Sequence, residues 1–231
     1  MTFGTFHPLD NPIWHALTTS QSKFAETSHL ARRFPVEVTA LAGLLEPTRE
    51  NYDSLASLMG EGQAAALFLQ SPPMPTAGWT IVETSPLLQM VYDGRGTSTT
   101  EVEMEELNAA NVSEMLELAE LTKPGPFGRR THEMGTYLGI RRGGRLVAMT
   151  GERLHMPGYT EVSAVCTHPE HLGFGYARAL IGETVRRISN RNEVPFLHVR
   201  QENTRAIELY ERLGFTNRAT FQLAVLSWGQ G

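Results

Sequence analysis

The chain has 231 residues, of which 41% are hydrophobic and 19% charged, and its formal net charge is −5 at pH 7. This composition is that of a globular protein, and the acidic balance argues against nucleic-acid binding, which favours a basic face. A single cysteine excludes an internal disulfide and indicates a reducing compartment. Because we find neither a signal-peptide pattern nor an apolar run of about 20 residues, we expect a cytoplasmic protein that does not enter a membrane.

The first hundred residues predict an α/β region without a recognisable chemical motif. Pro12 is typical of a first helical turn, and an apolar face over residues 48–59 that stops at Gly60 indicates a second helix. Apolar and β-branched runs predict three short strands, at 64–69, 79–82 and 88–92.

Two polar stretches interrupt this region. Ser85-Pro86 predicts a turn between the second and third of these strands. Residues 93–100, with the sequence DGRGTSTT, are typical of a linker. We therefore expect an α/β region over residues 1–100 and a second domain over residues 101–231.

The second domain begins with a helix and a β-meander. Asn111 and Glu114 form a capping-box pattern for a helix that ends before Pro124. A Gly- and Pro-rich loop follows over residues 124–133. Two strands then enclose the turn Arg142-Gly143-Gly144-Arg145, which predicts a hairpin because both glycines can take a positive φ.

The chain is organised around residues 161–178, EVSAVCTHPEHLGFGYAR. Small and β-branched residues predict a buried strand that ends before Pro169. Gly173 and Gly175 then lead into a helical pattern, so bare backbone N–H groups meet the positive end of a helix dipole. This arrangement predicts an anion site, most plausibly for phosphate.

The remaining chain adds a strand, a helix and a last strand. Residues 196–200 and 221–226 predict the strands, and Asn203 is a typical N-cap for the helix between them. Tyr210 lies on the apolar face of that helix, which Gly214 terminates.

The order of these motifs resembles the GNAT superfamily of CoA-dependent N-acyltransferases. Over residues 135–226 the sequence is most similar to the branch that contains the glycine N-acyltransferases. The resemblance implies an α/β (α+β) fold with a mixed, mostly antiparallel sheet and helices on both faces. It also suggests that residues 1–100 are a degenerate copy of the same half-fold.

The resemblance implies acetyl-CoA as cosubstrate, held at the strand and the glycine turn. Gly175 and Ala177 match the two small positions of the family's phosphate turn, whereas Leu172 replaces a polar residue and shifts binding onto backbone N–H groups. The residues expected to contact the cofactor are Val165, Cys166, Thr167, Leu172, Gly173, Phe174, Gly175, Tyr176, Ala177, Arg178, Asn203 and Arg205.

By the same resemblance, Tyr210 is the general acid for the departing CoA thiolate, since a phenol with a pKa of about 10 stays protonated at neutral pH. Glu161 is the first choice of base for the amine, through water, and Glu152 and His132 are weaker choices. The loop over residues 124–133 would admit the acceptor, with Phe127 and His132 as substrate contacts.

Each of these residues also has a plain structural interpretation. Tyr210 could be part of the core, and Glu161 could be solvated. Cys166 is more often structural than nucleophilic in such a strand. Arg178 and Arg205 could meet CoA phosphates or water equally well.

Two further binding sites are suggested only weakly by the pattern. His168 and His171 have a metal-like spacing but lack further ligands, so we expect no metal. Gly173-Phe174-Gly175 begins a dinucleotide fingerprint, but Arg178 stands at its third glycine. We interpret that match as chance.

The sequence therefore predicts an N-acetyltransferase that acts on a primary amine of a small molecule or peptide by direct attack. The alternative is a non-catalytic acyl-CoA-binding or regulatory module. The expected partner is the acceptor alone, without nucleic acid or membrane, in a monomer or a homodimer.

Overall fold

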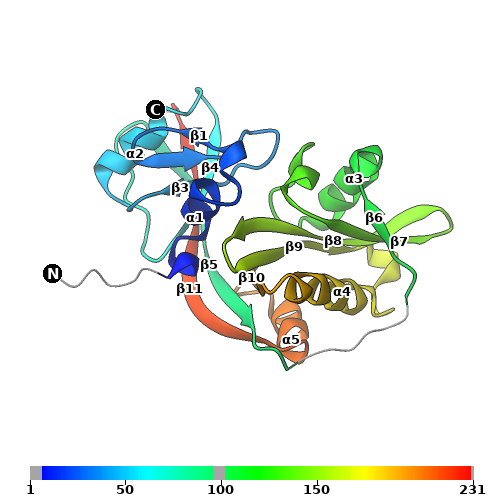
Figure 1. Ribbon diagram of the computed structural model, residues 1–231. Helices are drawn as coiled ribbons and strands as arrows, with labels where there is room; N and C mark the ends of the chain where they lie inside the picture. Colours follow the sequence, from blue (N-terminus) through cyan, green and yellow to red (C-terminus); the bar gives the residue numbers. More distant parts are fainter. Residues whose placement is uncertain (1–6, 96–101, 230–231) are drawn as a thin grey trace. The chain divides into compact units, whose positions relative to one another are not determined.

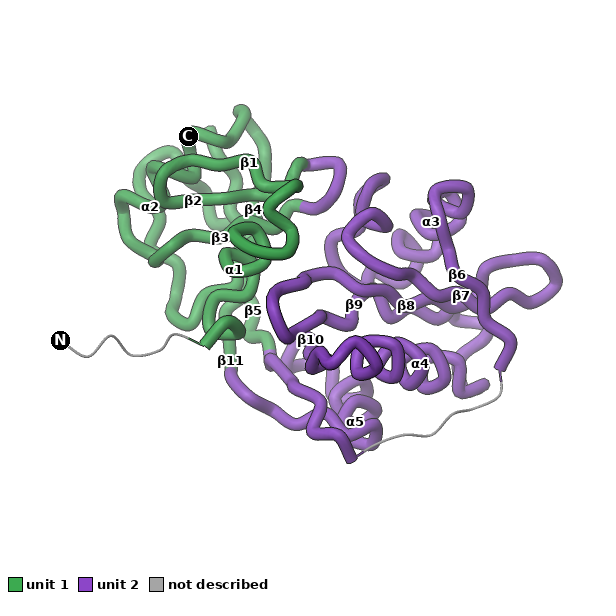
Figure 2. Tube along the Cα trace, in the orientation of Figure 1, with its two compact units in different colours: residues 1–35, 40–87, 220–231 green, residues 36–39, 88–219 purple. Residues whose placement is uncertain are grey.

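The computed structural model describes residues 7–95 and 102–229. They cluster into two compact units (Figure 2), each made of separate chain segments. Within the described residues, unit 1 contains 7–35, 40–87 and 220–229, and unit 2 contains 36–39, 88–95 and 102–219. The predicted division cuts the chain once, at residue 100, whereas each unit combines segments that are far apart in the chain. That division stays a prediction.

Unit 1 contains two helices and a small antiparallel sheet. Helix α1 (Pro12–Thr18) begins at the predicted proline, and α2 (Arg49–Ala56) ends earlier than predicted because residues 57–59 continue as tighter turns. The strands are β1 (Glu26–Thr27), β2 (Ala31–Arg33), β3 (Ala42–Leu44) and β4 (Ala64–Leu69). Two short 3-10 helices are η1 (Pro8–Asp10) and η2 (Ser22–Phe24).

A core of fully buried side chains holds unit 1 together. Tyr52 and Leu55 of α2 pack against Leu67 of β4. Trp79 and Trp228 close one side of this cluster with their ring centroids 5.1 Å apart.

Two long strands supply residues to both units. Strand β5 (Trp79–Tyr92) is continuous, so the predicted turn at Ser85-Pro86 is wrong. Proline has a φ that an extended strand accepts, and its cost is one missing ladder hydrogen bond. Strand β11 (Phe215–Trp228) begins earlier than the predicted 221–226. The prediction missed its first part because residues 216–220 are mostly polar.

Unit 2 is built on a mixed sheet, as predicted. The order β10-β9-β8-β7-β6 is antiparallel except for the parallel pair β9 and β10. The strands are β6 (Glu105–Leu107), β7 (Tyr137–Arg142), β8 (Arg145–Met156), β9 (Tyr159–Thr167) and β10 (Val194–Arg200). The β7–β8 turn places Gly143 and Gly144 at φ +57° and +81°, which confirms the predicted hairpin.

Helices cover both faces of this sheet (Figure 1). Helix α3 (Val112–Thr122) packs on the face that carries Cys166, and α4 (Tyr176–Asn190) and α5 (Thr204–Arg212) pack on the face that carries Val162. Short 3-10 helices are η3 (Ala109–Asn111), η4 (Thr131–Met134) and η5 (Pro169–His171). None of the helices in the described ranges combines the length and apolarity needed to cross a bilayer.

The capping box predicted for α3 is wrong. The Asn111 carboxamide instead accepts a hydrogen bond from the Asn108 N–H, at 2.9 Å, and so belongs to the preceding 3-10 turn. The Glu114 carboxylate forms an ion pair with Arg141, at 2.6 Å. Residues 96–100 of the predicted linker lie outside the described residues.

Candidate active site

Strand β9 is distorted near its middle by a bulge. Its pairing with β8 shifts register between Met149 and Gly151, and Ala164 takes a φ of +50°. The Thr150 hydroxyl donates to the Ser163 carbonyl at 3.2 Å. A left-handed alanine costs energy that the surrounding structure must offset, and such residues concentrate at functional sites.

Beyond this region β9 separates from its parallel neighbour. The register between β9 and β10 covers Tyr159, Thr160 and Glu161 of β9, and it ends there although both strands continue. Backbone groups of residues 162–167 are left without a ladder to β10.

The glycine turn lies immediately after β9 and opens helix α4. Gly173 and Gly175 have φ values of +85° and +78°, and a Cβ at either position would meet open space. Among the described residues no side chain caps α4 at Gly175. The first turn of this 15-residue helix therefore offers N–H groups and the positive end of its dipole to an anion.

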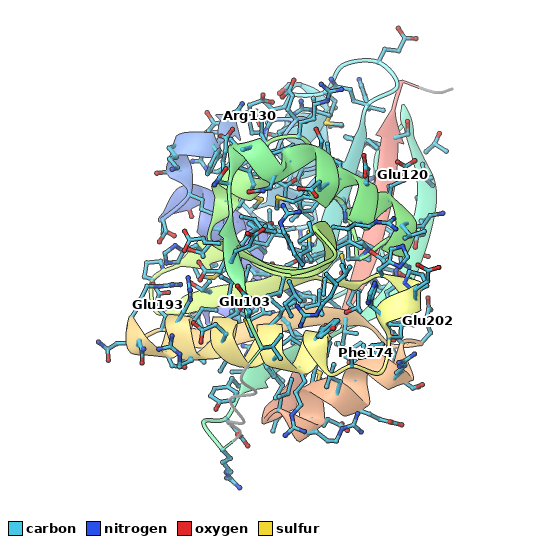
Figure 3. The ribbon with its side chains drawn as sticks, turned by 90° about the vertical axis from the view of Figure 1, so that its right-hand side faces the viewer. Glu103, Glu120, Arg130, Phe174, Glu193 and Glu202 are labelled. Atoms are coloured by element: carbon cyan, nitrogen blue, oxygen red, sulfur yellow. The ribbon has the colours of Figure 1, made fainter. Side chains whose placement is uncertain are left out.

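Aromatic side chains flank the turn. Phe174, which is labelled in Figure 3, stacks its ring on Tyr176 with the ring centroids 5.7 Å apart. Its side chain is 63% exposed. Arg142 donates to the Tyr176 hydroxyl at 2.9 Å and lies 4.9 Å from its ring centre. Sequence reasoning missed this cation beside the turn, because the hairpin that carries Arg142 lies 34 residues away in the chain.

Tyr210 lies on α5 in the same core cluster as Val162 and Val165 of β9. Asn203 caps the helix as predicted: its side chain accepts from the Ala206 N–H at 3.2 Å. Burial, with a smaller effect of Cys166, raises the pKa of Tyr210 to about 12. The phenol therefore stays protonated throughout the neutral range.

The Cys166 thiol is buried on β9. Burial raises its pKa to about 12, so the thiolate is scarce at neutral pH. Because the thiolate is the reactive form, this environment makes Cys166 a poor nucleophile.

Glu161 is the centre of a buried polar network. Its carboxylate accepts from Arg153 Nε and Nη2 at 2.8 and 2.6 Å, and from His198 Nδ1 at 2.7 Å. Burial opposes its charge, but the Arg153 and His198 partners outweigh that effect and lower the pKa of Glu161 to about 2. The carboxylate is therefore ionised and committed to two partners.

The tautomer of His198 follows from its neighbours. Gln89 Oε1 accepts from Arg218 Nη1 at 2.8 Å, so the Gln89 amide nitrogen is the donor toward His198 Nε2, 3.1 Å away. His198 therefore carries its proton on Nδ1 and donates it to Glu161. Burial lowers the pKa of His198, with partial opposition from Glu161, so the ring is neutral.

A small cavity, too narrow to hold a water molecule, lies between the β9 bulge and the loop over residues 124–133. It is lined by Pro124, Gly125, Pro126, Phe127, Thr131, Tyr137, Arg153, Ser163 and Ala164. Phe127, predicted to contact substrate, lies in this wall and meets Tyr137 edge-to-face at 5.8 Å. His132 does not line the cavity, and its Nδ1 is buried without a partner in the described part of the chain.

Several residues of this arrangement escaped the sequence analysis. Tyr137, Arg153 and His198 were not among the candidates. The available signal was Glu152-Arg153 in the middle of an otherwise apolar strand, since charged residues buried in a strand require partners. Arg178 and Arg205 are exposed, and the described residues contain no group of three potential ligands for a metal.

Comparisons with known proteins agree with this geometry. The model of the FR47-like protein family matches residues 137–223. A GNAT-family member from Novosphingobium aromaticivorans DSM 12444 is 38% identical, with a TM-score of 0.90 over 96% of this chain and 99% of that chain. No curated protein matches the sequence.

Two more distant structures share the fold. A GCN5-related N-acetyltransferase from Kribbella flavida is 15% identical, with a TM-score of 0.60 over 94% of this chain and 93% of that chain. A GCN5-related N-acetyltransferase-like protein from Streptococcus suis 89/1591 is 13% identical, with a TM-score of 0.58 over the same shares. The near-complete match at 38% identity shows that the chain belongs to the GNAT family and is a GNAT-type N-acetyltransferase.

Proposed function

We propose that this enzyme moves an acetyl group from acetyl-CoA to a primary amine of a small molecule or peptide by direct attack. One observation carries the proposal: the part of β9 that no longer pairs with β10 leads into the glycine turn that opens α4, and Tyr210 packs in the core cluster on the same strand. That arrangement combines an unpaired strand edge, an anion site and a phenol. A thioester attached to a pyrophosphate-bearing arm requires these three features.

The proposed cofactor site fits the donors that are present. The backbone of Val165 to Thr167 would pair with the pantetheine arm, and the glycine turn would hold the pyrophosphate. The Thr167 hydroxyl is buried and has no hydrogen-bond partner within the described ranges, so it suits a polar ligand at this edge. Leu172, 46% exposed, offers no side-chain donor there.

Further cofactor contacts are proposed around the same turn. Tyr176 and Ala177 contribute backbone N–H groups at the first turn of α4, beside Phe174. Asn203 would reach the pantetheine arm. Arg178 and Arg205 are exposed cations that would meet phosphate groups.

Acetyl-CoA would supply a thioester whose carbon accepts the amine while the C–S bond breaks. Tyr210 is the proposed donor to the departing sulfur. A free thiol has a pKa of about 8.5, and that of Tyr210 is about 12. The phenol therefore stabilises the thiolate through a hydrogen bond more readily than by complete proton transfer.

Glu161 remains the proposed proton acceptor for the amine, reached through water. Its pairing with Arg153 and His198 makes it a weak base. The amine must therefore reach the site largely unprotonated, and the network mainly fixes the position of the carboxylate. Glu152, which forms an ion pair with Arg191 at 3.0 Å, and His132 stay secondary choices.

Acceptor entry is assigned to the loop over residues 124–133. Phe127 supplies an apolar wall to the cavity beside the β9 bulge. The second proposed contact, His132, would need the loop to bring its ring toward that wall.

We also propose that residues 1–100 are a degenerate GNAT-like copy, as in the branch that contains the glycine N-acyltransferases. The two helices and short strands of unit 1 support this idea. A copy would superpose on unit 2 strand by strand in the same order, and a different strand order would contradict the proposal.

The function is tested by thiol release from acetyl-CoA against a panel of amines. We expect turnover with at least one acceptor and a loss of about 10²- to 10³-fold in kcat for Tyr210→Phe, the scale for one lost donor at a developing anion. An unchanged kcat would refute the role of Tyr210. CoA binding by calorimetry without turnover on any amine would favour the non-catalytic alternative.

A further inference from the structure

The glycine turn exposes a large aromatic side chain that the fold does not need there. Phe174 lies between Gly173 and Gly175, and 63% of it is exposed. The core clusters formed by the described residues of unit 2 do not include it. Leu172, two residues earlier, is exposed as well. Single apolar side chains in water are ordinary, whereas two neighbouring ones at a proposed binding turn require a functional explanation.

The ring of Phe174 is held in place by a buried neighbour. It stacks on Tyr176 with an interplanar angle of 18° and the ring centroids 5.7 Å apart. Tyr176 is itself fixed, because it is buried and Arg142 donates to its hydroxyl at 2.9 Å. The ring of His171 lies beside both aromatic rings, with centroids 6.2 Å from Phe174 and 6.4 Å from Tyr176. Phe174 is thus the exposed outer layer of an ordered stack, so a ligand that packs on it loses little of the protein's side-chain entropy.

The surroundings define the chemistry of the group that Phe174 would bind. The residue belongs to a turn whose backbone N–H groups suit an anion, and α4 begins two residues later. Neither Leu172 nor Phe174 can pair with a charge or donate a hydrogen bond through its side chain. The matching ligand group is therefore planar, uncharged and attached to a phosphate. A nucleotide base has these three properties.

We propose that Phe174 is the surface on which the adenine of CoA stacks. This inference rests on the proposed function, which assigns the pyrophosphate of CoA to the glycine turn. Adenine is joined to that pyrophosphate through one ribose, so it is the flat part of the cofactor on that side. Stacking on Phe174 would supply affinity that Leu172 cannot supply through hydrogen bonds. A base on an aromatic side chain typically improves affinity by about 10-fold or more.

Calorimetry with three ligands tests this assignment. CoA contains adenine and a 3′-phosphate, dephospho-CoA lacks only the 3′-phosphate, and 4′-phosphopantetheine ends before the adenosine. Phe174→Ala should raise the Kd of CoA and of dephospho-CoA by the same factor, about 10-fold, and leave that of phosphopantetheine within about twofold. Because Phe174 is mostly exposed, the variant should melt close to the wild type.

Two other substitutions separate stacking from simple apolar contact. Phe174→Trp keeps an aromatic face and should bind CoA at least as tightly as the wild type. Phe174→Leu is apolar without such a face and should resemble Phe174→Ala. Leu121→Ala on α3 is the matched control, because Leu121 is also about half exposed and lies outside the proposed cofactor contacts. It should change none of the three Kd values.

Phe174→Trp also provides a measurement that depends on neither affinity nor turnover. An indole that stacks on adenine loses fluorescence. Saturating CoA and dephospho-CoA should therefore quench the added tryptophan, and saturating phosphopantetheine should not. The wild type, titrated in parallel, corrects for the three native tryptophans.

The outcomes distinguish failure of the adenine site from failure of the proposed function. An equal rise of all three Kd values in Phe174→Ala would overturn the adenine site, because residue 174 would then act on the turn itself. Full CoA affinity in Phe174→Leu would overturn stacking. Unchanged CoA binding in Phe174→Ala, with loss of a wild-type dimer in sedimentation, would make the patch an interface between copies. These three results leave the acetyltransferase function intact, whereas a wild type that does not bind CoA would reject both proposals.

Discussion

The Arg153 guanidinium grips the Glu161 carboxylate through two nitrogens, at 2.8 and 2.6 Å, with both side chains buried. His198 donates to the same carboxylate from β10, which borders β9 on the side away from β8. A carboxylate held in this way is a fixed negative charge whose position depends on three strands at once.

Stability should depend on pH through Glu161. Its pKa is about 2 in the folded protein and 4.5 ordinarily, so ionisation favours the folded state. The contribution is fully present above about pH 4.5 and is lost as the pH falls toward 2. Glu161→Gln should remove this pH dependence and lower the free energy of unfolding by about 3–5 kcal/mol, the usual cost of breaking a buried pair.

Denaturant unfolding from pH 2 to pH 7 measures this effect. Glu120→Gln on α3 is the control, because Glu120 is exposed. If Glu161→Gln matched the wild type both in its free energy of unfolding and in how that free energy changes with pH, the ion pair would contribute nothing to the stability of the fold.

The pH dependence of catalysis should reflect the amine rather than the enzyme. Glu161 stays ionised above about pH 3, and Tyr210, with a pKa of about 12, stays protonated up to about pH 11. The rise of kcat/KM with pH should therefore move with the pKa of the acceptor when two amines of different basicity are compared. A midpoint common to both amines would identify a titrating enzyme group and contradict this assignment.

The close approach of Tyr137 to Gly151 should be sensitive to one methyl group. Gly151→Ala places a Cβ 2.2 Å from the ring and should destabilise the protein by about 1–3 kcal/mol or more, as overpacking does. The clash disappears in the double variant Gly151→Ala/Tyr137→Ala. Its loss of unfolding free energy should therefore be smaller than the sum of the losses in the two single variants. Additive losses in urea unfolding would place the ring elsewhere.

A side-chain donor at position 172 should strengthen CoA binding. Leu172 is exposed beside the glycine turn, so Leu172→Arg adds a cation without disturbing the core. We expect a Kd for CoA about 3- to 10-fold lower at low salt, corresponding to roughly 1 kcal/mol, with the gain decreasing as salt rises. Calorimetry with Leu172→Gln as a neutral counterpart checks this, and equal affinity for the arginine variant and the wild type would move the pyrophosphate away from the turn.

Local patterns in the sequence predicted most of unit 2. Glycine accepts a positive φ, and proline fixes φ and lacks an N–H donor, so both residues mark where elements begin and end. These signals located the β7–β8 hairpin, α3 and the glycine turn. The same rule gave a wrong prediction at Pro86, because an extended strand accepts the φ of proline and loses only one ladder hydrogen bond.

The polar interior of the site could not be predicted in the same way. Arg153, Glu161 and His198 lie on three strands, and their pairing depends on register rather than on spacing along the chain. The buried Tyr137 hydroxyl has no hydrogen-bond partner among the described residues, a property that no sequence pattern expresses. Hydrophobic periodicity reports burial, whereas hydrogen-bond satisfaction is a property of the assembled fold.

The shared strands have a consequence for how the chain is made. Strand β11, residues 215–228, supplies the last residues of unit 2 and a partner for β4 in unit 1. During synthesis, neither unit can complete its sheet until this final strand has left the ribosome. Pairing of residues 64–69 with residues 222–227 closes a very long loop, which favours slow folding and prolonged exposure of strand edges. The order of the strands therefore delays completion of both sheets until β11 is available.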